Sequence, residues 1–130
     1  MTPQDTDADF SDEFCRFLQT TVPAVEAAEL LLAVKRDPAR WWTISELLGS
    51  GVALQEADAA RHLEGLQARG LVALDAERRA QFRAPEALAA HVATLEKVYR
   101  ERPVTLIRVI YGLRDSKIRS FAEAFRLRGK

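Results

Sequence analysis

The sequence has few of the residues that carry catalysis, metal binding or cross-linking. One cysteine among 130 residues excludes a disulfide within the chain and favours a reducing compartment. The two histidines, His62 and His91, are far apart, and no Cys/His/Asp/Glu cluster has the spacing of a metal site. The G-x-S-x-G, P-loop and G-x-G-x-x-G motifs are also missing. We therefore expect no enzymatic activity, no metal and no cofactor.

Long apolar runs are absent as well. The longest are about five residues, such as Leu30 to Val34, whereas a membrane-spanning helix needs about 20. The first residues are acidic and are not followed by an apolar stretch, so they do not resemble a signal peptide. The sequence thus predicts a soluble protein without a membrane span, located in the cytoplasm.

The chain carries no net charge, because 19 basic residues balance 19 acidic residues. The distribution is uneven: residues 1–30 contain seven acids and one base, and residues 97–130 contain ten bases and three acids. A neutral total gives no general attraction to nucleic acid, but the basic final quarter gives a local one. The acidic start can also pair with the basic end, within one chain or between two.

Apolar residues recur at helical spacing before and after the middle of the chain. A first helix, capped by Asp9 or Ser11, has a strongly aromatic face, and its Cys15 is predicted to be buried. A second helix over residues 24–35 is apolar nearly all round and is expected in the core. After Pro85 a long helix follows, and Pro103 marks a kink or a restart.

The end of the chain is predicted to be helical too. The β-branched residues 104–111 would suit a strand, but with no partner strand nearby we expect a helix that ends at Gly112. A last basic helix is predicted after a cap at Asp115 or Ser116, with Ile118, Phe121, Ala122 and Phe125 on its apolar face.

The middle of the chain has a denser set of signals. Thr43 and Glu46 form a T-x-x-E capping box at the start of a short helix, in which Leu47 and Leu48 are expected to point inward. A Gly-Ser-Gly break at residues 49–51 leads to a longer helix over residues 55–69 with Ala59, Leu63 and Leu66 on its inner face. Strands at 71–74 and 80–83 then flank a turn at 75–79.

This order of short helix, turn, longer helix and hairpin resembles the winged helix-turn-helix transcriptional regulators of bacteria, the broad group that includes MarR-like and ArsR-like repressors. The motifs that carry the resemblance are T-x-x-E-L from Thr43, R-H-L-x-x-L-x-x-R-G-L-V from Arg61, and the hairpin after them. The resemblance implies a mainly α fold, a winged helix-turn-helix with a two-stranded β-hairpin wing and extra N- and C-terminal helices. Residues 1–9 would be flexible, and residues 10–130 would form one domain with its core at 22–84 and a C-terminal helical extension at 85–130.

The resemblance also implies a DNA-binding transcriptional regulator that forms a homodimer through its terminal helices. The longer helix would enter the major groove of duplex DNA, with Arg61 reading guanine and Gln55 reading adenine. Arginines of the wing would meet phosphates or the minor groove, although exposed arginines are equally common in a solvated turn. The predicted DNA-binding residues are Gln55, Arg61, His62, Arg78, Arg79 and Arg83.

A second interpretation is an adaptor that has kept the winged-helix fold without binding DNA. Acidic residues outnumber basic ones on the longer helix, and Asp58 can pair with Arg61. In this case the basic C-terminal helices would dock an acidic protein partner or a membrane surface. The adjacent Trp41 and Trp42 allow two interpretations as well: a stacking platform for bases, or, preferably, an attachment of the short helix to the core.

Overall fold

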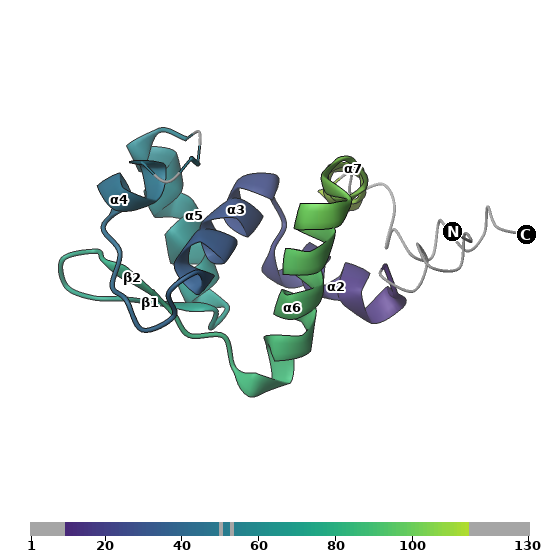
Figure 1. The fold of residues 1–130 in the computed structure, drawn as a ribbon, viewed down its shortest axis with the longest axis horizontal. Helices are drawn as coiled ribbons and strands as arrows, with labels where there is room; N and C mark the ends of the chain where they lie inside the picture. The colour runs from purple at the N-terminus through teal and green to yellow at the C-terminus, as the bar shows by residue number, and fades with distance from the viewer. Residues whose placement is uncertain (1–9, 50, 53, 115–130) are drawn as a thin grey trace, which may run out of the picture. The chain divides into compact units, whose positions relative to one another are not determined.

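The computed structural model describes residues 10–49, 51–52 and 54–114 of the chain. It is mainly helical, with one two-stranded antiparallel sheet between helices (Figure 1). The described residues fall into two compact units, of which one is Val25–Ala89 and the other comprises residues 10–24 and 90–114. The mainly α composition and the two-stranded hairpin were both predicted from the sequence.

The unit Val25–Ala89 contains three helices followed by the hairpin. Its first helix is the core helix predicted from its composition, since seven of its eleven residues are buried. Its third helix buries Ala59, Leu63 and Leu66, as the spacing predicted. Gly70, at φ +82°, adopts the left-handed conformation that ends this helix and turns the chain into the hairpin. The elements are α3 (Val25–Lys35), α4 (Ile44–Gly49), α5 (Glu56–Ala68), β1 (Val72–Leu74) and β2 (Ala80–Phe82).

The predicted capping box begins α4. The Thr43 hydroxyl accepts a hydrogen bond from the Glu46 N–H at 3.1 Å, and a Glu46 carboxylate oxygen accepts one from the Thr43 N–H at 2.9 Å. Arg40 donates to the same carboxylate at 2.7 Å. These bonds lower the pKa of Glu46, the bond from the Thr43 backbone most and the bond from Arg40 next. Leu47 is buried as expected, but Leu48 stays partly exposed.

The hairpin contacts a residue that the sequence did not assign to the sheet. β1 and β2 pair with Val72 opposite Phe82 and Leu74 opposite Ala80. Ala80 also pairs on its other side with Trp42, through two backbone hydrogen bonds of 2.8 Å each. Trp42 is buried, as its attachment to the core requires, and its indole N–H has no acceptor among the described residues. The residues just before α4 are therefore tied to the hairpin.

The second unit is built from α2 (Asp12–Thr21), most of α6 (Glu86–Glu101) and α7 (Pro103–Arg114). Ser11 caps α2, as one of the two predicted alternatives, by accepting from the Phe14 N–H at 3.1 Å. Phe14 and Phe17 are buried, and His91 of α6 stacks on Phe17 with ring centres 5.2 Å apart. Aromatic packing thus joins α2 to α6.

The ambiguous segment after Pro103 is a helix, as predicted. α7 starts at Pro103 but does not end at Gly112; it continues to Arg114. A glycine weakens a helix by about 1 kcal/mol without ending it, and the burial of Leu113 favours continuation of the helix past Gly112. The predicted last helix, from Asp115 or Ser116 onwards, lies outside the described residues. None of the described helices is long and apolar enough by itself to cross a membrane; only α2 and α3 taken together reach that length and composition.

Candidate nucleic-acid interface

The exposed side of α5 carries two of the six predicted DNA-binding residues. Gln55 is the N-cap residue of α5 and is exposed, and its side chain makes no capping hydrogen bond. Arg61 is exposed one and a half turns later, where it forms a close ion pair with Asp58. His62 is partly buried on the flank of the helix. Gln55 before the helix and Arg61 on it are therefore both exposed, and Arg61 has a carboxylate beside it.

The tip of the hairpin is organised by Asp75. One oxygen of its carboxylate accepts from the backbone N–H groups of Glu77 at 3.0 Å and Arg79 at 2.8 Å. The chain passes through Arg78 in the left-handed conformation, at φ +64°. The carboxylate of Asp75 thus provides acceptors for two backbone N–H groups of the turn, and both arginines at the tip are exposed.

Arg79 is held by two carboxylates. Its Nε donates to Asp75 at 2.7 Å, and its terminal nitrogen lies 2.9 Å from a carboxylate oxygen of Glu77. Partial burial acts to raise the pKa of Asp75, but hydrogen bonds from the backbone and side chain of Arg79 outweigh it and lower that pKa. The same pairing raises the pKa of Arg79. Arg79 is therefore a charged residue whose charge is already balanced within the turn.

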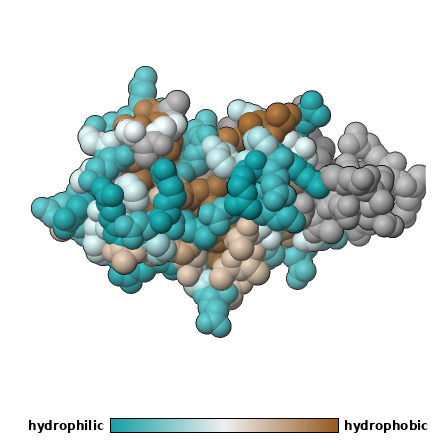
Figure 2. Space-filling view, viewed as in Figure 1, coloured by the Kyte–Doolittle hydropathy of each residue, from teal (hydrophilic) through white to brown (hydrophobic). Residues whose placement is uncertain are grey.

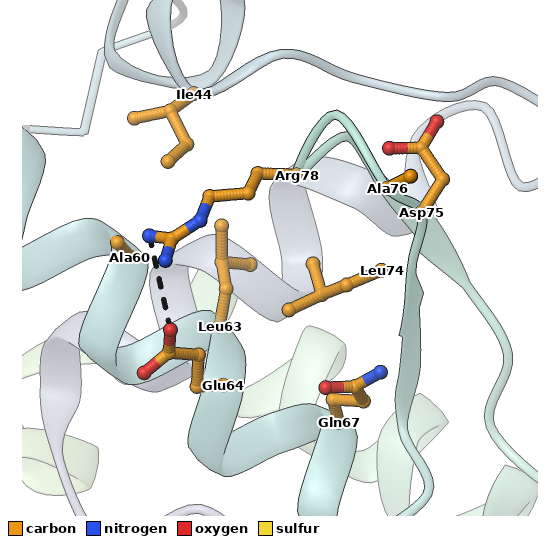
Figure 3. A pocket seen from close by; sticks show the side chains of 9 residues that line it. All are labelled: Ile44, Ala60, Leu63, Glu64, Gln67, Leu74, Asp75, Ala76 and Arg78. Atoms are coloured by element: carbon orange, nitrogen blue, oxygen red, sulfur yellow. Dashed lines mark ion pairs between the residues drawn. The ribbon is translucent and has the colours of Figure 1, made fainter.

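Arg78 reaches from the hairpin toward α5. Its terminal nitrogen lies 3.8 Å from a carboxylate oxygen of Glu64, which is an ion pair too long for a hydrogen bond (Figure 3). A groove of about 270 Å³ lies between α5 and the hairpin, and both side chains line it. Arg78 also lines a second hollow of about 250 Å³, together with Glu56 and Ser45 at the starts of α5 and α4. The hairpin tip thus stands beside the starts of both helices.

Arg83 does not belong with the tip. It follows the last residue of β2 and lies at the opposite end of the hairpin, where its N–H donates to the Leu71 carbonyl. Its Nε donates to the Gln81 side chain at 2.5 Å, and its guanidinium lies 5.9 Å from the centre of the Trp41 ring. The sequence predicted Arg83 on the return strand and Arg78 and Arg79 at the tip, and antiparallel pairing places Arg83 at the base of the hairpin.

The sequence did not indicate which residues connect the hairpin to α5 and to the segment before α4. Glu64 and Arg78 meet only because the hairpin folds back against α5, and no local spacing in the sequence indicates this pair. The Trp42–Ala80 pairing is equally non-local. By contrast, the Arg61–Asp58 pair follows the i, i+3 spacing and was predicted.

No group of three or more His, Cys, Asp or Glu side chains suited to a metal ion occurs in the part of the chain that the structure describes. Comparisons of the chain with protein-family models, with curated proteins and with solved structures found no match. The geometry of the interface is therefore the basis for a functional proposal.

Proposed function

We propose that Val25–Ala89 is a winged helix-turn-helix domain and that the protein is a DNA-binding transcriptional regulator of the cytoplasm. The order of α3, the Trp42 pairing, α4, α5 and the β1–β2 hairpin supports the fold. The observation that carries the functional proposal is the position of Arg78, which extends from the hairpin tip beside the start of α5. In such a domain the longer helix enters the major groove while the wing meets the backbone.

The proposed contacts with DNA are of two kinds, to base edges and to phosphates. Gln55 and Arg61 on the exposed side of α5 would read base edges, with His62 at the flank, and Arg78 and Arg79 would hold phosphates. The ion pairs that these arginines make lie at the surface, where solvent screens them, so each contributes little to stability. A phosphate accepts two parallel N–H bonds from one guanidinium, and it therefore replaces such a partner at little cost.

The test is binding of a random-sequence duplex, measured by fluorescence anisotropy across a series of salt concentrations. Affinity should fall steeply with salt, and the double substitution of Arg78→Ala with Arg79→Ala should flatten the log–log slope by about 2, one unit for each lost phosphate contact. The matched control replaces Arg16 and Arg36, two exposed arginines outside the interface. No binding at low salt, or equal flattening in the control, would refute the proposal.

The same proposal includes a homodimer formed through the terminal helices. Val104, Ile107 and Tyr111 recur at i, i+3 and i+7 on α7, and their exposed fractions are 60%, 36% and 54%. Figure 2 shows an apolar patch over this helix. Three large apolar residues exposed on one helical face are typical of a surface that a second subunit covers.

The second candidate is the adaptor without DNA binding, and one observation favours it. Arg61, Arg78 and Arg79 each have a carboxylate partner, so the interface has little free positive charge among the described residues. An acidic protein partner would then dock on the basic C-terminal helices. The salt titration separates the two functions, since an adaptor would not retain duplex DNA. Truncation after Arg114 should abolish partner capture if the adaptor function is correct.

A further inference from the structure

We propose that the groove between α5 and the hairpin binds a free α-amino acid with an apolar side chain. The groove has a volume of about 270 Å³ and opens to solvent beside the ion pair of Arg78 and Glu64. Figure 3 shows the two charged groups facing each other, with aliphatic side chains around them. The proposal concerns this groove alone and does not require that the domain bind DNA.

The walls of the groove are suited to an aliphatic group. Ile44 comes from the start of α4, Leu63 and Ala60 from α5, and Leu74 from the end of β1. Leu63 is held in the core, while the other three are partly exposed along the groove. A side chain of a ligand that covers them removes their remaining apolar surface from water, and this burial provides the non-specific part of the binding free energy.

The charges beside this apolar surface determine the class of ligand. The Arg78 and Glu64 side chains are 68% and 55% exposed, and their charged atoms lie 3.8 Å apart without a hydrogen bond between them. An α-amino acid carries a carboxylate and an ammonium group on one carbon atom. Its carboxylate can bind the Arg78 guanidinium through two N–H donors while its ammonium group donates to Glu64. Binding of one amino acid thus replaces the long Arg78–Glu64 ion pair with two hydrogen-bonded ion pairs.

The other polar residues of the groove do not change this assignment. Asp75 also lines the groove, but its carboxylate already accepts from the Arg79 guanidinium and from two backbone N–H groups. Gln67 is neutral. A ligand with only a carboxylate would approach the negative charge of Glu64 without an ammonium group to offset it, and a ligand with only an amine would make no bond to Arg78. Both one-charge ligands should therefore bind more weakly than the amino acid.

The binding is expected to be weak, because the groove is open and the ligand is small. We expect a dissociation constant on the order of 1 mM. The measurement is a titration of the full-length ¹⁵N-labelled chain followed by amide chemical shifts. Four ligands separate the contributions of the two charges and of the side chain. L-leucine has all three. Of the others, 3-methylbutylamine lacks the carboxylate, 4-methylpentanoate lacks the amine, and glycine keeps both charges without the side chain.

The expected result is a set of shifts in α5 and the hairpin, with leucine binding about tenfold more tightly than each of the other three. Arg78→Gln should reduce leucine to the affinity of the amine, and Glu64→Gln should reduce it to that of the acid. Both positions are exposed, and glutamine is polar and neutral at each, so the fold should be kept. Arg61→Gln, which lies outside the groove, is the matched control.

Three results would overturn the inference: no shifts with leucine, equal affinity for 4-methylpentanoate and leucine, or an equal loss in the Arg61→Gln control. The titration contains no DNA. Its failure therefore leaves the DNA-binding proposal intact, and failure of the DNA titration leaves the groove proposal intact.

Discussion

The two compact units of the chain differ in the charged and apolar residues that their surfaces expose. In Val25–Ala89 the exposed arginines of α5 and the hairpin tip are matched by nearby carboxylates. In the unit that contains α7, the exposed face of that helix carries large apolar residues instead. One surface is polar and nearly neutral, whereas the other leaves apolar area in contact with water.

This difference indicates two kinds of partner that salt can separate. Exposed ion pairs and phosphate contacts weaken as ionic strength rises, because the Debye length shortens to about 8 Å at physiological salt. Apolar association is not weakened in this way, and salts such as sulfate strengthen it. A contact with DNA through Val25–Ala89 and a contact with a second subunit through α7 should therefore respond to salt in opposite directions.

The largest expected effect concerns the interior of the α7-containing unit. Burial raises the pKa of Cys15 to about 11, and the nearby charge of Asp12 adds to the effect. Because the thiolate is the reactive species, a disulfide reagent at pH 8 should modify the folded protein at least about 100-fold more slowly than the unfolded protein. The rate in denaturant is the internal control. Modification of the native protein at the unfolded rate would contradict the buried position of Cys15.

The next effect tests the apolar surface. Ile107→Lys places a charge in the middle of the exposed stripe of α7 and should raise the dimer dissociation constant at least about tenfold in sedimentation equilibrium. Ala93→Lys adds the same charge at an exposed position on α6 and should leave the dimer intact. A native protein that is monomeric at micromolar concentration would exclude the dimer altogether.

The features of the fold that the sequence predicted are those that depend on residues close together in the chain. The capping box of Thr43 and Glu46, the buried face of α5 and the Asp75 turn depend on residues within one or two turns of each other, and the structure has all of them. The end of α7 was misplaced, because a glycine ends a helix only where it adopts the left-handed conformation, as Gly70 does after α5.

The candidate site was less predictable. Sequence identified arginines at the hairpin tip, but it did not indicate that Arg78 would lie beside Glu64 or that Trp42 would pair with Ala80. These facts depend on the packing of the hairpin against α5 and on the register of its strands. Both are set by contacts between distant residues, which periodicity and spacing do not report.

A smaller effect tests the carboxylates that organise Val25–Ala89. The pKa values of Glu46 and Asp75 are lower in the folded protein than their ordinary values. Their contribution to stability is therefore complete above the ordinary carboxyl pKa and is lost as pH falls through the lower folded values, below about pH 4. The urea midpoint should fall between pH 7 and pH 3, and it should fall less in Glu46→Gln and Asp75→Asn. Glu13→Gln, an exposed position on α2, should behave as the native protein does.

The smallest expected effect is a change in DNA affinity, and it distinguishes a DNA-binding domain from an adaptor most directly. Glu64→Gln removes the carboxylate beside Arg78 and also removes a negative charge that would face a phosphate. If Arg78 contacts DNA, this loss should increase affinity for duplex DNA about threefold to fivefold at low salt, a gain of roughly 0.6–1 kcal/mol. The gain should shrink as salt screens the charge.

The control for this last comparison is Glu13→Gln, which changes the net charge equally but lies on α2. If both substitutions raise affinity by the same factor, the effect comes from net charge and Arg78 is not part of the interface. A gain confined to Glu64→Gln would mean that the carboxylate partners of the arginines limit DNA affinity. The near neutrality of this surface would then reflect weakened DNA binding, because removing a single carboxylate recovers part of the affinity.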